Sequence, residues 1–344
     1  IFNTAFLISL ITLASGYAGS VHRAAAFQIP QKQSHRKMTS SDADDREPFT
    51  PASVAFVGNS MLYFNDIPRA FLNIAGSGAF HRQDSCLRGG ASLVSLLVDG
   101  NGMQKTFRTP NAILQTNSGS NKEEDPTYDI GAPTVDALLS KQWDFVVMND
   151  FTQAPARQSY REASSRALVE FYAPLFRQCG ATPIFVMTPA YRKPVNDSAD
   201  LGSVAEFTAS LKEGYKSYVS VLEKELPLPN QQPRIAPVGL AFLHIHDTNH
   251  SMWEKLFCND DFHPSPHGTY LQCCVLHWTL FRRAPERDLA LPLDGNFQKR
   301  IWGNARFTQH GNGDPLPLPT IEEANYLFDV AAKICQEIPQ RGKL

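Results

Sequence analysis

The chain has 344 residues, which is enough for one large α/β domain or for two small ones. Hydrophobic residues make up 42% of it, and 32 Lys and Arg against 34 Asp and Glu leave a formal net charge of -2. Such a balance gives no electrostatic attraction to a polyanion or to an acidic membrane surface, and this argues against nucleic acid as a partner.

The N-terminal segment has the features of a secretory leader. An apolar run at residues 6–14 is followed by small residues as far as Ala18, as in a signal peptide. The run is too short to span a bilayer, so we expect no stable membrane insertion. The sequence starts with Ile1, and Met38 is a second candidate start that would leave the protein cytoplasmic.

Residues 20–50 are polar and without periodicity, which predicts a disordered linker. We therefore expect a leader and linker at residues 1–48, one domain at residues 49–337 and a tail at residues 338–344.

Secretion or an endomembrane lumen is the expected location. Six scattered cysteines would pair only there, and two glycosylation sequons, at Asn196 and Asn249, agree with it. The sequence does not specify an oligomeric state.

Buried strands and amphipathic helices alternate along the domain. Short apolar runs bounded by polar residues predict strands at 54–57, 145–148 and 184–187. Helical spacing of apolar residues begins at Ile67, at Leu168, at Phe207 and again at Tyr270. Strand followed by helix, repeated, predicts an α/β fold with a central parallel sheet and right-handed crossovers.

Local signals mark the ends of these elements. Asp66 stands where the first helix would take an N-cap, and Gly180 stands where the second would take a left-handed C-cap. Residues 117–125 are rich in Ser, Gly, Asn, Lys and Glu, which predicts a loop.

A serine follows the first predicted strand directly, in Gly58-Asn59-Ser60. In an open parallel sheet the ligand sits beyond the carboxyl ends of the strands, so Ser60 is presented to a crevice. The alternative is an ordinary strand-to-helix turn.

A histidine and an aspartate stand three residues apart before the last of these helices. Ser265 and Pro266 predict the start of that helix, so His263 lies in the loop before it. The spacing lets the Asp260 carboxylate reach one imidazole nitrogen and leaves the other to take a proton from a serine. The alternative is an Asx-type turn with a surface histidine.

An oxyanion hole requires hydrogen-bond donors beside the serine. Gly90, which precedes a helical pattern, offers a backbone N–H, and Asn149, which ends the second apolar strand, offers an amide. The alternatives are a plain turn at Gly89-Gly90 and a strand-end cap at Asn149.

Taken in order, these motifs resemble the four sequence blocks of the SGNH hydrolase superfamily (GDSL-like esterases and lipases), in a variant with Gly-Asn-Ser in place of Gly-Asp-Ser. The similarity covers roughly residues 53 to 283. It implies a flavodoxin-like three-layer sandwich and no cofactor or metal. It also implies that Ser60 is the nucleophile and first oxyanion donor, Gly90 the second donor and Asn149 the third, with His263 as the base and Asp260 as its orienter.

The third block departs from the superfamily pattern. Val147 stands where that block normally has glycine, so Gln153 is an alternative source of the amide. Which of Gly89 and Gly90 faces the oxyanion also stays open, although Gly90, followed by a small residue, fits better.

The resemblance predicts a serine esterase that removes a small acyl group, such as acetyl, from a small molecule or a carbohydrate. Four aromatic residues follow predicted strands and would either line the substrate site or pack in the core: Tyr63, Phe64, Phe151 and Tyr191. Two rival functions are a metal-dependent hydrolase that uses the region of His244, His246 and His263, with His244 and His246 at a strand end, and a catalytically inactive module of the same fold that binds a glycan.

Overall fold

The computed structural model describes residues 51–76, 78–103, 131–195, 197–292, 295–303 and 316–337. The expected leader, linker, C-terminal tail, Met38, the loop at 117–125 and the sequon at Asn196 lie outside the described residues, so the predicted domain boundaries stay predictions. The account below concerns the unit that begins at Phe49.

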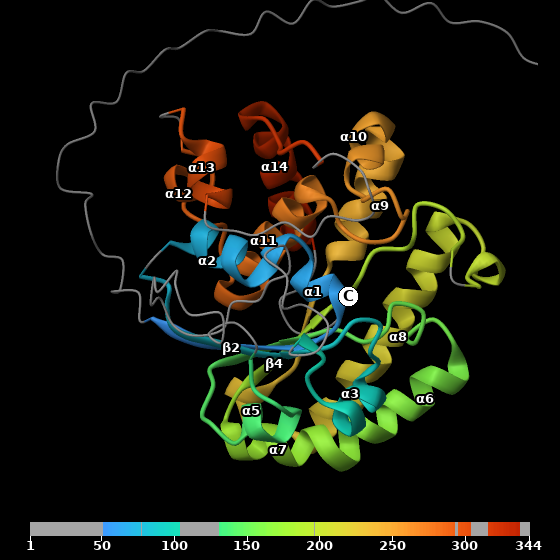
Figure 1. Cartoon of the computed structure of the whole chain (residues 1–344). Helices are drawn as coiled ribbons and strands as arrows, with labels where there is room; N and C mark the ends of the chain where they lie inside the picture. The colour runs from blue at the N-terminus through green and yellow to red at the C-terminus, as the bar shows by residue number, and fades with distance from the viewer. Residues whose placement is uncertain are drawn as a thin grey trace, which may run out of the picture. The chain divides into compact units, whose positions relative to one another are not determined.

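A five-stranded, fully parallel sheet forms the centre of this unit (Figure 1), with strand order β2-β1-β3-β4-β5. The strands are β1 (Ala52–Gly58), β2 (Phe80–Leu87), β3 (Phe145–Met148), β4 (Thr182–Val186) and β5 (Arg234–Ala236). This order is the flavodoxin-like doubly wound arrangement, in which the chain switches direction between β1 and β3. The predicted fold class is confirmed.

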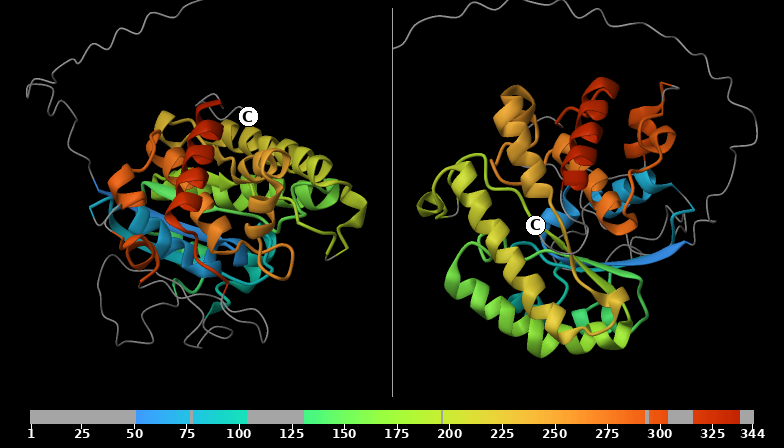
Figure 2. Two further views of the ribbon diagram at one scale, coloured as in Figure 1. Left: turned by 90° about the horizontal axis from the view of Figure 1, so that it is seen from above. Right: turned by 180° about the vertical axis from the view of Figure 1, so that it is seen from behind.

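Helices cover both faces of the sheet, as the two views in Figure 2 show, and each face has its own core. Along β1, Val54 and Phe56 point into one core while Ala55 and Val57 point into the other. The first core is formed with α1 (Ser60–Tyr63), α2 (Ile67–Ala75), α9 (Val238–Thr248), α10 (His250–Lys255), α11 (Pro266–Phe281), α12 (Arg287–Ala290), α13 (Phe297–Trp302) and α14 (Ile321–Glu337).

The second core lies under a layer that starts with α3 (Leu93–Asp99) and α5 (Val135–Leu139). It continues through α6 (Gln158–Ala167), a π-helical turn at Leu168–Tyr172, α7 (Ala173–Cys179) and the long α8 (Val204–Glu225). Gly180 ends α7 at φ 77°, the left-handed conformation predicted for it.

One local prediction holds only in part, and another is wrong. Asp66 stands at the N-cap position of α2, as predicted, but its side chain makes no capping hydrogen bond, because the residue is in a left-handed conformation, at φ 54°, with its side chain fully buried near Arg69. His244 and His246 do not end a strand but lie within α9.

The described residues include every cysteine of the chain. All six cysteines are unpaired thiols, and five of them are buried. No helix in the described part of the chain is long and apolar enough to cross a bilayer.

Candidate active site

Ser60 is positioned by the end of the first strand. Strand β1 ends at Gly58, and Ser60 is the first residue of α1, whose N-cap is Asn59. The Asn59 side chain accepts a hydrogen bond from the Met61 N–H at 3.1 Å and so fixes the start of this short helix. Ser60 is buried, with 8% of its surface exposed.

His263 meets Ser60 although 203 positions separate them. The Nε2 atom of His263 lies 2.7 Å from Ser60 Oγ, and its Nδ1 atom lies 2.7 Å from Asp260 Oδ2. Because a carboxylate only accepts hydrogen bonds, Nδ1 carries the proton and Nε2 is left to accept from the serine hydroxyl. The structure therefore brings together the three residues that the sequence singled out.

Two phenylalanine rings hold the imidazole in this orientation. Phe64 stacks on His263 with the ring centroids 3.6 Å apart and the planes at 7°, and Phe262 lies against it at 4.0 Å. His263 is buried, so these contacts restrict its ring to the plane that faces Ser60. The sequence predicted that Phe64 would line the substrate site or pack in the core, and it did not single out Phe262.

Asp260 is held as a carboxylate. Burial alone would raise its pKa, but hydrogen bonds and charge from His263, together with the backbone N–H groups of His263 and Phe262, bring the pKa down to about 2. Those two N–H groups donate to Oδ1 at 3.0 and 3.2 Å. The negative charge that orients an imidazolium is thus present across the neutral range.

Arg192 supports the loop that carries Asp260 and His263. Its backbone N–H donates to the Asp261 carbonyl at 2.7 Å, and its Nε pairs with the Asp261 carboxylate at 2.6 Å. The guanidinium also donates to the carbonyls of Glu254 and Cys258. No sequence signal links Arg192 to Asp261, because the two are 69 positions apart.

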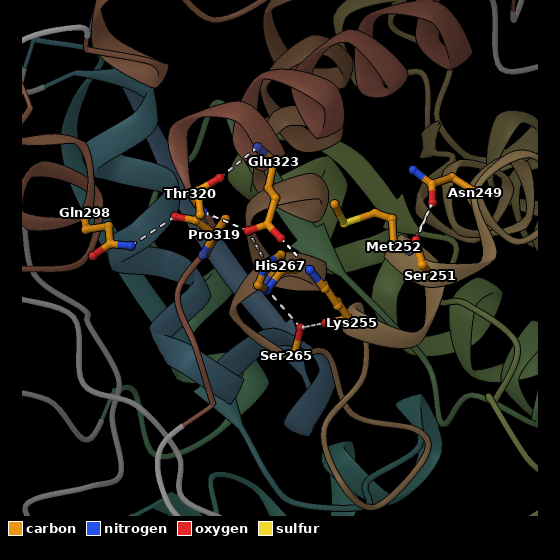
Figure 3. Close-up of polar contacts among 10 residues, drawn as sticks. All are labelled: Asn249, Ser251, Met252, Lys255, Ser265, His267, Gln298, Pro319, Thr320 and Glu323. Carbon is orange, nitrogen blue, oxygen red and sulfur yellow. Dashed lines mark hydrogen bonds and ion pairs between the residues drawn. The ribbon is translucent and has the colours of Figure 1, made fainter.

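The other end of this loop is fixed to two helices, as Figure 3 shows. The Ser265 hydroxyl donates to the Lys255 carbonyl and accepts from the N–H groups of His267 and Gly268. Glu323 of α14 then joins His267 Nε2 at 3.0 Å and Lys255 Nζ at 2.7 Å. The predicted N-cap at Ser265 is confirmed.

Asn149 lies at the expected strand end but has other partners. Its Nδ2 donates to Asn59 Oδ1 at 2.8 Å and to the Asp150 carbonyl at 2.9 Å, and its Oδ1 accepts from the Asn59 N–H. Both amide protons are engaged, so a role as oxyanion donor would require one of these bonds to break. The alternative, Gln153, accepts a hydrogen bond from Arg157 Nε at 3.0 Å and contacts Tyr191.

The two glycines after β2 differ in their surroundings. Gly90 adopts φ 69°, and a Cβ there would meet nothing within 4 Å. A Cβ on Gly89 would lie 2.9 Å from the Tyr63 hydroxyl, which hydrogen-bonds the Ser60 side chain. Of the two glycines, Gly89 is therefore the one that lies next to a residue in contact with Ser60. A role for Gly90 as oxyanion donor stays a prediction.

The histidines proposed for a metal do not gather around one point. His246, on α9, contacts Trp253 of α10, whereas His263 lies between Phe64 and Phe262. Among the described residues, no group of three or more His, Cys, Asp or Glu side chains is placed to hold a metal ion.

No protein-family model matches the sequence, and no curated protein gives a significant match. Among solved structures, one similar chain is described as "a putative SGNH hydrolase from Slackia heliotrinireducens", at 22% identity and a TM-score of 0.43, covering 66% of this chain and 97% of that one. Another is a DUF4886 family protein from Bacteroides uniformis, at 14% identity and a TM-score of 0.48, covering 83% of this chain and 95% of that one. Because both TM-scores are below 0.5, the argument for a function rests on the geometry of the site. The chain is similar in structure, at low identity, to a protein described as "a putative SGNH hydrolase".

Proposed function

We propose that this chain is a serine esterase of the SGNH type, with Ser60 as nucleophile, His263 as general base and Asp260 as its orienter. The observation that carries the proposal is the unbroken line of two 2.7 Å hydrogen bonds from Ser60 through His263 to Asp260. A surface histidine in an Asx turn would not be buried against the hydroxyl of a serine 203 positions away.

In the proposed mechanism His263 takes the proton of Ser60 as Oγ bonds to the ester carbonyl carbon. Backbone N–H groups of Ser60 and Gly90 stabilise the oxyanion. When the tetrahedral intermediate collapses, His263 gives the proton to the departing alkoxide. The alcohol then dissociates, and the acyl group stays bonded to Ser60. Water, deprotonated by the same imidazole, then releases the carboxylic acid and restores the serine.

A pocket that two aromatic rings, Tyr191 and Phe262, connect to His263 is the candidate for the alcohol part of the substrate. It has a volume of about 250 Å³, and its lining includes Tyr191, Lys193 and Ser203. The Tyr191 ring, which lines the pocket, lies 5.6 Å from Phe262, and Phe262 contacts His263. Polar groups beside an aromatic ring suit a hydroxylated alcohol such as a sugar, so we keep a small acyl ester of a carbohydrate as the proposed substrate. Secretion remains part of the proposal.

The proposal is tested with chromogenic esters of increasing acyl length, using wild type and Ser60→Ala. We expect turnover of the shortest esters by wild type and a loss of at least about 10³-fold in Ser60→Ala, because no hydroxyl is left to form the acyl-enzyme. The control is Ser159→Ala, which removes an exposed serine hydroxyl on α6 and should leave turnover unchanged.

Melting temperatures of all three proteins should be nearly equal. Substantial turnover by pure Ser60→Ala would overturn the assignment. Turnover that chelation abolishes and Zn²⁺ restores would favour the metal-dependent alternative, and sugar binding without turnover would favour the inactive module.

A further inference from the structure

The proposed mechanism gives no role to one buried hydroxyl group at the site, that of Tyr63. Tyr63 is the last residue of α1, three positions after Ser60, so the two side chains lie on the same side of one helical turn. Only 3% of Tyr63 is exposed, and its hydroxyl hydrogen-bonds the Ser60 side chain.

The direction of this hydrogen bond follows from the rest of the site. Ser60 donates its only proton to His263 Nε2, because Nδ1 of that ring donates to Asp260. Ser60 Oγ therefore has only acceptor capacity left, so the Tyr63 O–H donates to it. Burial raises the pKa of Tyr63, so the hydroxyl stays protonated across the working range.

The Tyr63 hydroxyl also borders the turn that would supply the second backbone donor. Its oxygen lies 2.9 Å from the position that a Cβ on Gly89 would take. Gly89 and Gly90 follow β2, and the Arg88 N–H donates to the Gly58 carbonyl at 3.0 Å, which ties this turn to the end of β1. The hydroxyl is thus placed between the nucleophile and the Gly89-Gly90 turn.

The amide of Asn149, by contrast, is engaged by Asn59 and the Asp150 carbonyl. We propose that Tyr63 is a catalytic residue and supplies the side-chain donor of the oxyanion hole. In the resting enzyme its O–H donates to Ser60 Oγ. As Oγ bonds to the carbonyl carbon, the O–H turns to the carbonyl oxygen, which gains the negative charge, and the tyrosine keeps its proton. This inference rests on the proposed esterase function.

The direct test is Tyr63→Phe, which removes the hydroxyl and keeps the ring. We expect kcat on a short chromogenic ester to fall about 100-fold with KM nearly unchanged, as for the loss of one oxyanion donor. Affinity for a boronic acid that forms a tetrahedral adduct with serine should fall by a similar factor. The pH dependence of kcat/KM should keep its acid limb, because His263 remains the base.

The control is Tyr270→Phe, which removes a buried hydroxyl that donates to the Ala290 carbonyl at 3.0 Å, away from the triad. It should lower the melting temperature about as much as Tyr63→Phe and leave kcat unchanged.

A second variant, Gly89→Ala, tests the same hydroxyl group by adding a methyl group next to it. The added methyl group would crowd the Tyr63 oxygen, so kcat should fall, and the fall should be smaller when Tyr63 is already Phe. If Tyr63→Phe does not fold, Gly89→Ala alone carries the test, through a fall in kcat with KM nearly unchanged; wild-type kcat in Gly89→Ala would then overturn the role of Tyr63.

Wild-type kcat and boronate affinity in Tyr63→Phe, with Ser60→Ala inactive, would overturn the role of Tyr63 and leave the esterase proposal standing. Full activity of Ser60→Ala would overturn the esterase proposal itself.

Discussion

Asn59, between Gly58 and Ser60, links the segments that follow two neighbouring strands. Its Nδ2 donates to the carbonyls of Ala91 and Asp150 at 2.8 and 3.1 Å, and its Oδ1 accepts from Met61 and Asn149. An aspartate could accept but not donate, so this network requires an amide. The Gly-Asn-Ser variant of the resembled pattern thus has a physical reason in this chain.

Asn59→Asp should therefore destabilise the protein, although it only replaces the side-chain NH₂ group by an oxygen. A carboxylate would face two carbonyl oxygens that have lost their donor, and we expect the free energy of unfolding to fall by about 2 to 5 kcal/mol. Urea denaturation at neutral pH measures this loss. The control, Asn73→Asp, affects a part-buried amide whose bond to the Ile301 carbonyl lies outside the site, and it should cost less. An Asn59→Asp protein as stable as wild type would contradict the account of this network.

At the scale of elements, α14 secures the helix that follows the proposed catalytic loop. Glu323 on α14 binds His267, in the first turn of α11, and Lys255, at the end of α10 (Figure 3). Burial would raise the pKa of Glu323, but the hydrogen bonds from Lys255, the Thr320 N–H and His267 outweigh it and bring the pKa down to about 2. Burial lowers the pKa of His267 below its ordinary value, so at neutral pH the neutral ring donates to the carboxylate.

The lowered pKa of Glu323 makes its contribution to stability depend on pH. Because the carboxylate is favoured in the folded state, the contribution is fully present above pH 4.5, the ordinary pKa, and is lost as the pH falls through about 2. Glu323→Gln should thus lower the free energy of unfolding at pH 7, and the difference from wild type should shrink toward pH 2.

Denaturant titrations at several pH values measure this difference. Glu322→Gln is the control, because the neighbouring side chain is exposed. A difference that does not change between pH 7 and pH 2 would contradict the role of the Glu323 carboxylate.

The elements that could be predicted from sequence are those with a strong apolar pattern. The apolar runs at β1, β3 and β4 and the helical patterns of α2, α8 and α11 all lie where expected. Strand β2 was not predicted as an element, because this edge strand buries the polar residues Gln83, Asp84 and Ser85. Strand β5 was missed because three residues are too short for a pattern.

Some residues of the candidate site could also be predicted from sequence, and others could not. Asp260 and His263 are close in sequence, and the strand-helix junction marks Ser60, so local motifs point to all three. The oxyanion side is different, because Asn149 and Gly89 are placed by contacts between distant segments. No spacing in the sequence shows that Asn59 engages the Asn149 amide or that Tyr63 borders Gly89.

At the scale of the whole unit, the sheet order explains why distant residues meet. Strands β1, β2 and β3 are neighbours and parallel, so their carboxyl ends lie at one edge of the sheet. That edge includes the switch point between β1 and β3, where doubly wound sheets place their ligands. Ser60 follows β1 there, and the loop before α11 brings His263 to it. The proposed esterase chemistry depends on this meeting.

Labelling with a fluorophosphonate probe tests the central claim most directly, because the probe reacts with a serine activated by a base. Intact mass and peptide mapping after labelling should show one adduct per chain, on the peptide that contains Ser60. The adduct should be absent from Ser60→Ala and form much more slowly in His263→Ala. A folded wild-type protein that stays unlabelled, or a Ser60→Ala protein labelled as fast as wild type, would contradict the claim that Ser60 and His263 form a catalytic pair.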